Sequence, residues 1–181
     1  MKNGVVFIAG AYGVGKSTLC SKLSLTLRIP SFSAGDLISE VNGEIYGQNK
    51  VVKDKTENQN ILITAVKNKL NTHPIFLLAG HFFIFNKKDE VEVLPEFVYK
   101  ELPISKILLL ESDGDTIIKN IKSRDNKSYS ITSIENLIET ERNQAVKFSH
   151  QLDIPLCIHK MKFDQTDVDI ISTLLKGSDT L

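Results

Sequence analysis

Apolar residues follow two patterns along this chain, and each pattern predicts a different kind of element. Short runs rich in Val, Ile, Leu and Phe predict strands at 5–9, 75–79, 107–110 and 154–158, with a weaker strand at 29–33. Most of these runs are apolar at successive positions rather than at alternate ones. That pattern is typical of strands covered on both faces of a parallel sheet.

Between the strands, apolar residues recur three and four positions apart, which predicts helices. These helices begin near Gly15, near Ser33, before Ile61, at Ser112, at the capping sequence Thr132-Ser133-Ile134-Glu135, and near Val168. The alternation predicts one α/β domain over 1–181, with three layers and a five-stranded, mostly parallel sheet flanked by helices. Ligands of such folds bind at the carboxyl ends of the strands, so residues directly after each strand are the first site candidates.

The segment after the first strand carries the most specific pattern in the chain. Gly10-Ala11-Tyr12-Gly13-Val14-Gly15-Lys16-Ser17 matches G-x-x-x-x-G-K-[ST], the phosphate-binding P-loop or Walker A sequence, between a strand and a helix. Glycines allow a turn that aims backbone N–H groups inward, and the helix N-terminus adds partial positive charge. We expect residues 10–18, ending at Thr18, to bind ATP, with Lys16 on the β- and γ-phosphates and Ser17 on Mg²⁺.

Composition narrows the classes of partner. The chain has 181 residues, with 22 Lys and Arg against 22 Asp and Glu, so its formal net charge is zero. This balance argues against nucleic acid or an anionic membrane as a partner. No apolar run approaches the ~20 residues of a membrane span and no signal-peptide pattern is present, so we expect a cytoplasmic protein. Cys20 and Cys157 lie in apolar segments and are expected to be reduced.

Other segments follow the strands in a recognisable order. They are Gly35-Asp36, Leu77-Leu78-Ala79-Gly80-His81, Ile107 to Asp113, Arg124-Asp125 and Arg142-Asn143. Together with the P-loop they resemble the nucleoside monophosphate kinases, and most nearly the short-lid adenylate kinases of archaea and the related nuclear type. The likeness in element order covers nearly the whole chain. It implies a P-loop kinase fold with an acceptor-binding insertion at about 34–73 and a short lid at about 124–133.

The resemblance also implies an activity and a set of roles. The activity is transfer of the γ-phosphoryl group of ATP, with Mg²⁺, to a nucleoside monophosphate. Lys16, Arg124 and Arg142 would stabilise the moving phosphoryl group, while Asp36 and His81 would lie at the small-molecule acceptor.

Two positions and one segment depart from the pattern of these relatives. Ala79 stands where they carry an Asp that holds the water shell of Mg²⁺, and Asn120 stands where many of them stack Arg on adenine. Residues 48–58 contain Lys53 and Lys55 but no Arg for an acceptor phosphate. These departures keep two alternatives open: a kinase of another small metabolite, and a nucleotide-binding regulatory protein with little turnover.

Overall fold

The computed structural model describes residues 3–42, 55–85 and 91–177 of the chain. Its main sheet has five parallel strands in the order β2-β3-β1-β6-β7, as expected from the apolar runs. The strands are β1 (Gly4–Ala9), β2 (Ser31–Ser33), β3 (Ile75–Ala79), β6 (Ile104–Glu111) and β7 (Leu156–Lys160). A separate antiparallel pair is formed by β4 (Phe83–Phe85) and β5 (Val91–Val93).

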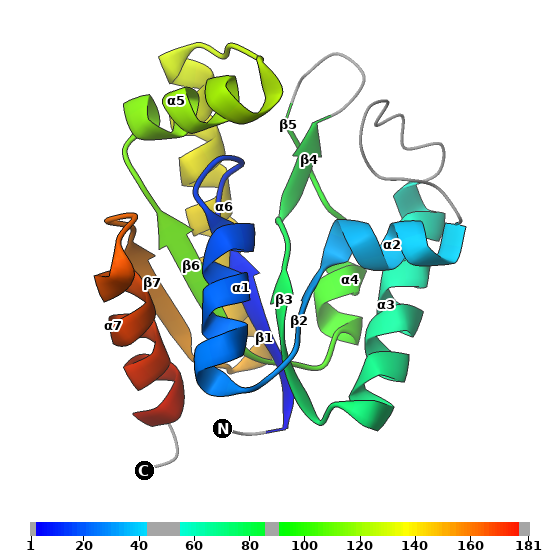
Figure 1. Cartoon of the computed structure of the whole chain (residues 1–181). Helices are drawn as coiled ribbons and strands as arrows, with labels where there is room; N and C mark the ends of the chain where they lie inside the picture. Colours follow the sequence, from blue (N-terminus) through cyan, green and yellow to red (C-terminus); the bar gives the residue numbers. More distant parts are fainter. Residues whose placement is uncertain (1–2, 43–54, 86–90, 178–181) are drawn as a thin grey trace.

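Helices cover both faces of the main sheet and make the three predicted layers. They are α1 (Lys16–Leu27), α2 (Ala34–Asn42), α3 (Lys55–Thr72), α4 (Glu96–Glu101), α5 (Gly114–Asp125), α6 (Ile131–Leu152) and α7 (Gln165–Lys176). Figure 1 shows α1 and α7 in front of the sheet, with α5 above the carboxyl ends of β1 and β6. The predicted insertion at 34–73 therefore contains α2 and α3, and its residues 43–54 lie outside the described part.

Successive residues of β1 point into two different cores, which explains why this strand is apolar at every position. Val6 and Ile8 pack with Leu19 and Leu23 of α1 and with residues of α7. Val5, Phe7 and Ala9 pack on the other face, against residues of α2, α3, α4 and α6. A strand with both faces buried has no position left for a polar side chain.

Two predicted helix starts are corrected by the structure. The α5 N-cap is Asp113 rather than Ser112, because the Asp113 carboxylate accepts hydrogen bonds from the backbone N–H and the hydroxyl of Thr116, both at 2.9 Å. The α6 N-cap is Ser130 rather than Thr132, since Ser130 Oγ accepts from the Ser133 N–H at 3.1 Å.

The last strand also differs from its prediction. It pairs with β6 from Leu156 to Lys160 and so begins two residues after the predicted start at Ile154. Pro155 contributes only its carbonyl oxygen, which accepts from the Ile107 N–H at 2.9 Å. Both cysteines are free thiols, as expected. Among the described helices, none is long and apolar enough to cross a membrane.

Candidate active site

The turn between β1 and α1 has the backbone conformation that the P-loop sequence requires. Gly10 and Gly13 have φ angles of +144° and +79°, in a region that other residues rarely adopt. A Cβ on Gly10 would lie 2.5 Å from the Leu110 carbonyl oxygen, and a Cβ on Gly13 would lie 2.7 Å from Cγ1 of Ile121. The loop therefore fits tightly between the end of β6 and the buried face of α5.

Lys16 is held inside this loop. Its ammonium donates hydrogen bonds to the carbonyl oxygens of Gly10 at 2.6 Å and Ala11 at 3.0 Å, and only 9% of the residue is exposed. Its Nζ also lies 3.4 Å from Nδ1 of His81. The lysine charge is therefore already at the P-loop, where phosphate oxygens of a nucleotide would replace backbone carbonyls as its partners.

Ser17 and Thr18 follow Lys16 in the first turn of α1, and both are exposed. Across the described ranges, no group of three or more His, Cys, Asp or Glu is placed to hold a metal ion. Mg²⁺ commonly uses one or two protein oxygens, several waters and the substrate phosphates. The residues present fit an ion that would arrive with the nucleotide, and Ser17 is the residue that would hold it.

His81 lies two residues after the end of β3 and contacts Lys16, the first residue of α1. Its ring stacks on Tyr12 of the P-loop, with 3.9 Å between centroids and 30° between planes. Its carbonyl oxygen accepts a 2.7 Å hydrogen bond from the hydroxyl of Tyr99 on α4. The structure thus brings together the predicted acceptor residue His81 and the predicted catalytic residue Lys16.

A residue that the sequence analysis missed completes this cluster. Glu141 of α6 is 1% exposed, and its Oε1 lies 3.1 Å from His81 Nδ1 and accepts a 3.1 Å hydrogen bond from the Phe82 N–H. Its other oxygen, Oε2, has no hydrogen-bond partner within the described structure. The signal in the sequence is a Glu on the apolar face of α6, four residues after Leu137 and four before Ala145.

Burial strongly perturbs the Glu141 carboxyl. Desolvation raises its pKa from 4.5 to about 8, while the charge of Lys16 and the backbone N–H groups of Phe82 and Gly10 act in the opposite direction. A carboxyl that gains or loses its proton near neutral pH, beside an imidazole and an ammonium, is an arrangement found at functional sites.

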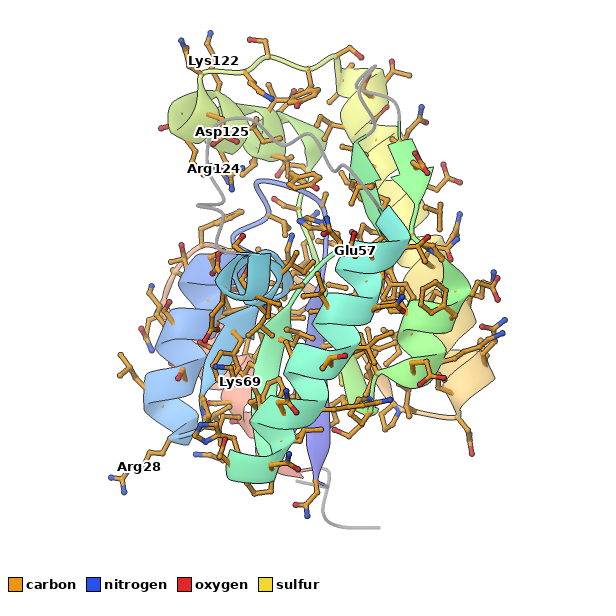
Figure 2. The ribbon with its side chains drawn as sticks, turned by 90° about the vertical axis from the view of Figure 1, so that its right-hand side faces the viewer. Arg28, Glu57, Lys69, Lys122, Arg124 and Asp125 are labelled. Carbon is orange, nitrogen blue, oxygen red and sulfur yellow. The ribbon has the colours of Figure 1, made fainter. Side chains whose placement is uncertain are left out.

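Arg124 and Arg142 each pair with a carboxylate. Arg124 makes a bidentate contact with Asp125, at 2.8 and 2.6 Å. This contact raises the pKa of Arg124, and the nearby Tyr12 and Tyr129 act in the same direction. Figure 2 shows Arg124 on the edge of α5 toward the P-loop turn, whereas Lys122 points away from it.

Arg142 follows Glu141 on α6 but points elsewhere. Its Nη2 lies 2.5 Å from Oε2 of Glu111, the last residue of β6. The Arg142 side chain is half exposed, whereas that of Glu111 is 14% exposed. Arg142 is therefore paired with the residue that follows Leu110, whose carbonyl oxygen lies beside Gly10 of the P-loop.

Asp36 lies in the first turn of α2, directly after β2, the strand that neighbours β3. Ser33, the last residue of β2, is paired with Ala79, so the first turn of α2 begins beside Gly80. The Asp36 N–H donates to Ser33 Oγ at 3.4 Å, which agrees with the predicted cap. Asp36 and His81 consequently follow adjacent strands at the same edge of the sheet.

Asn120 has a structural contact that the sequence does not reveal. Its side-chain amide donates a 2.9 Å hydrogen bond to the Gly13 carbonyl oxygen. Asn120 therefore links α5 to the P-loop.

Comparison with solved structures supports the fold. The chain matches shikimate kinase from Bacteroides thetaiotaomicron with a TM-score of 0.61 and 15% identity, over 98% of this chain and 99% of that chain. It matches shikimate kinase from Aquifex aeolicus with a TM-score of 0.61 and 18% identity, over 97% of this chain and 98% of that chain. A gluconokinase from Sinorhizobium meliloti matches with a TM-score of 0.54 and 8% identity, over 98% of this chain and 99% of that one.

These similarities establish the P-loop kinase fold. They do not show the short-lid adenylate kinase subtype. The comparison with curated proteins found no match. A family model described as "AAA domain" matches residues 9–138, which include the P-loop, β3, β6 and α5. Because this match spans well over half of the chain, the protein belongs to that AAA domain family.

Proposed function

We propose that the chain transfers the γ-phosphoryl group of ATP to a small-molecule acceptor. The observation that carries this proposal is the 3.4 Å contact between Lys16 Nζ and His81 Nδ1. The contact brings the lysine of the P-loop next to His81, which follows β3 at the carboxyl ends of β2 and β3. An acceptor would lie at this end of the sheet. Kinases among the similar solved structures support the same reaction class.

The residues of the site supply what phosphoryl transfer needs, which is positioning and neutralisation of charge. P-loop N–H groups and Lys16 bind the triphosphate. Ser17 would hold Mg²⁺, which neutralises charge on the phosphates when bound. Arg124 lies beside the P-loop and is suited to stabilise the transferring group, and Arg142 would do so after exchanging Glu111 for phosphate.

Two acceptor classes remain as candidates. The first is a nucleoside monophosphate, as the resemblance to short-lid adenylate kinases implies. The second is a small hydroxylated metabolite. It is favoured because the whole chain has three arginines, and two of them, Arg124 and Arg142, are each paired with a carboxylate. Few guanidinium groups therefore remain to bind an acceptor phosphate in a bidentate manner.

The proposal is tested by measuring ADP production from Mg-ATP. The acceptors are AMP, CMP, UMP, shikimate and gluconate, each with the purified chain and with Lys16→Ala. We expect one acceptor class to stimulate turnover and Lys16→Ala to abolish it. ATP binding without stimulation by any acceptor would instead support the regulatory alternative.

Arg124 and Lys122 provide a matched pair for the same assay, because both are basic residues of the last turn of α5. Arg124→Ala is expected to lower kcat at least about 10²-fold, since it removes a cation from the transferring group. Lys122→Ala, which removes an exposed cation pointing away from the P-loop (Figure 2), is expected to leave kcat unchanged. Equal effects of the two substitutions would contradict the role of Arg124.

A further inference from the structure

A carboxyl–imidazole pair faces the P-loop lysine, and it is built from residues sixty positions apart. Glu141 Oε1 lies 3.1 Å from His81 Nδ1, and both groups are near Lys16. The imidazole ring also stacks on the ring of Tyr12, and the Tyr99 hydroxyl donates to the backbone carbonyl oxygen of His81. The ring is therefore held in one orientation.

The hydrogen bonds around Glu141 favour one tautomer of that ring. Oε1 accepts from the Phe82 N–H, and it can accept a second hydrogen bond from a proton on His81 Nδ1. Lys16 Nζ lies farther from Nδ1, at 3.4 Å, than Glu141 Oε1 does, at 3.1 Å, and its shorter contacts of 2.6 and 3.0 Å are to carbonyl oxygens. In the neutral tautomer that carries its proton on Nδ1, Nε2 is unprotonated and basic.

We propose that His81 is the general base that deprotonates a hydroxyl group of the acceptor, and that Glu141 is the positioning residue that holds the imidazole for this step. This inference rests on the proposed function and names the acceptor class, a hydroxyl-bearing small molecule. The acceptor O–H bond breaks and its proton passes to His81 Nε2. The acceptor oxygen bonds to the γ-phosphorus as the bond to the β–γ bridging oxygen breaks, and ADP leaves.

A hydroxyl acceptor needs such a base, and a phosphate acceptor does not. The phosphate oxygens of a nucleoside monophosphate are already deprotonated at neutral pH, so that acceptor requires cations instead. Near His81 the described structure offers one cation, Lys16, which the ATP phosphates would engage, and the carboxyl group of Glu141. Arg28 lies at the opposite end of α1 from the P-loop (Figure 2), and so it supplies no charge here.

The groups that face the pair give it a characteristic pH response. They are Lys16 from α1, Tyr12 from the P-loop, and Tyr99 from α4, whose pKa is raised well above its ordinary value by burial and by Glu141. Within this set, the Glu141 pKa of about 8 falls in the neutral to weakly basic range. Since the ionised carboxyl favours the imidazolium that forms during transfer, kcat should rise with pH across this range.

The test compares His81→Gln, Glu141→Gln and their double variant in the full chain, with Glu139→Gln as an isosteric control on an exposed position of α6. Shikimate and gluconate are the hydroxyl acceptors, and AMP, CMP and UMP the phosphate acceptors. With a hydroxyl acceptor, His81→Gln is expected to lower kcat about 10²-fold or more and Glu141→Gln about 10-fold or more, with KM for ATP within about threefold.

The double variant is expected to be no slower than His81→Gln, because the two residues act as one unit. The rise of kcat with pH should be absent from Glu141→Gln and present in Glu139→Gln. Transfer to nucleoside monophosphates alone, with kcat unchanged in His81→Gln, would overturn this inference and leave the proposed function standing. No transfer by the unsubstituted chain to any acceptor would count against the proposed function itself.

A second measurement needs no acceptor and is unaffected by a fold defect in a variant. Long-range ¹⁵N–¹H NMR of the histidine rings in the unsubstituted chain reports which nitrogen of His81 is protonated. The Nδ1–H form is the expected result. The Nε2–H form would overturn the inference, because Nε2 would then have no lone pair for the acceptor proton.

Discussion

The side-chain amide of Asn120 donates a 2.9 Å hydrogen bond to the Gly13 carbonyl oxygen, and this bond ties α5 to the P-loop. Asn120→Ala should leave that oxygen without its partner and lower the free energy of unfolding by about 1 kcal/mol. It should also weaken ATP binding several-fold, because the loop is less preorganised. Urea unfolding and calorimetric titration with ATP measure the two effects. Lys119→Ala, at the exposed neighbouring position, is expected to change neither, and equal effects would argue against the link.

Substitution of Gly13 should destabilise the fold more than substitution of its partner Asn120. In Gly13→Ala the new Cβ would lie 2.7 Å from Ile121 Cγ1 and 3.0 Å from the Ile117 carbonyl oxygen, at a φ of +79°. We expect the free energy of unfolding to fall by about 2–4 kcal/mol, from the combined clash and backbone strain. Gly177→Ala is the control, since its Cβ would meet no atom within 4 Å, and it should stay within about 0.5 kcal/mol. Similar unfolding midpoints for the two variants would contradict this reasoning.

The buried carboxyl of Glu141 should make stability depend on pH. Its pKa is raised from 4.5 to about 8, so between these values the folded chain binds a proton that the unfolded chain has released. The free energy of unfolding should therefore fall as pH rises through this window, by about 1 kcal/mol per pH unit. Glu141→Gln should flatten the dependence, as measured by urea unfolding at several pH values. The same slope in both proteins would show that another group is responsible.

Asp167 should stabilise the segment that borders Gly15. This buried carboxylate lies 2.7 Å from Nε2 of His159 and accepts backbone N–H bonds from Lys162 at 3.0 Å and Phe163 at 2.7 Å. Asp167→Ala leaves these donors unpaired and should lower the free energy of unfolding by about 2–4 kcal/mol.

Loss of Asp167 should also weaken ATP binding. A Cβ on Gly15 would lie 3.4 Å from the Phe163 ring and 3.5 Å from the Met161 methyl, so this segment borders the P-loop. Asp169→Ala, exposed on the same helix, is the matched control, and both properties should be unchanged in it. Unchanged ATP affinity in Asp167→Ala would limit that residue to a role in stability.

The main sheet and the P-loop are predictable because their signals are local. The run at 75–79 lies between Pro74 and Gly80 and agrees with β3 at both ends. By contrast, α4 and the β4–β5 pair are short and depend on tertiary packing, including the burial of Val98 and Tyr99. Their sequences carry too few residues for a clear period.

The residues of the candidate site likewise divide into those that a local sequence signal predicts and those that only the fold reveals. Lys16 is found by its motif, and His81 by its place after a strand. Glu141 is separated from His81 by 60 positions, and its role depends on the packing of α6 against the loop after β3. A polar residue on an apolar helix face marks it in the sequence, but only the fold shows which group it meets.

The central position of β1 also bears on how the chain folds. Its partners are β3 at 75–79 and β6 at 104–111, so the strand that carries the nucleotide loop acquires its second neighbour only when residues near 111 are present. Pairing strands so distant in sequence costs loop-closure entropy before the contacts between the strands can stabilise the pair. During synthesis, β1 leaves the ribosome before either of its neighbours, and it is enclosed on both sides only after β6 has followed. A nascent chain that ends before β6 should consequently be unable to retain ATP.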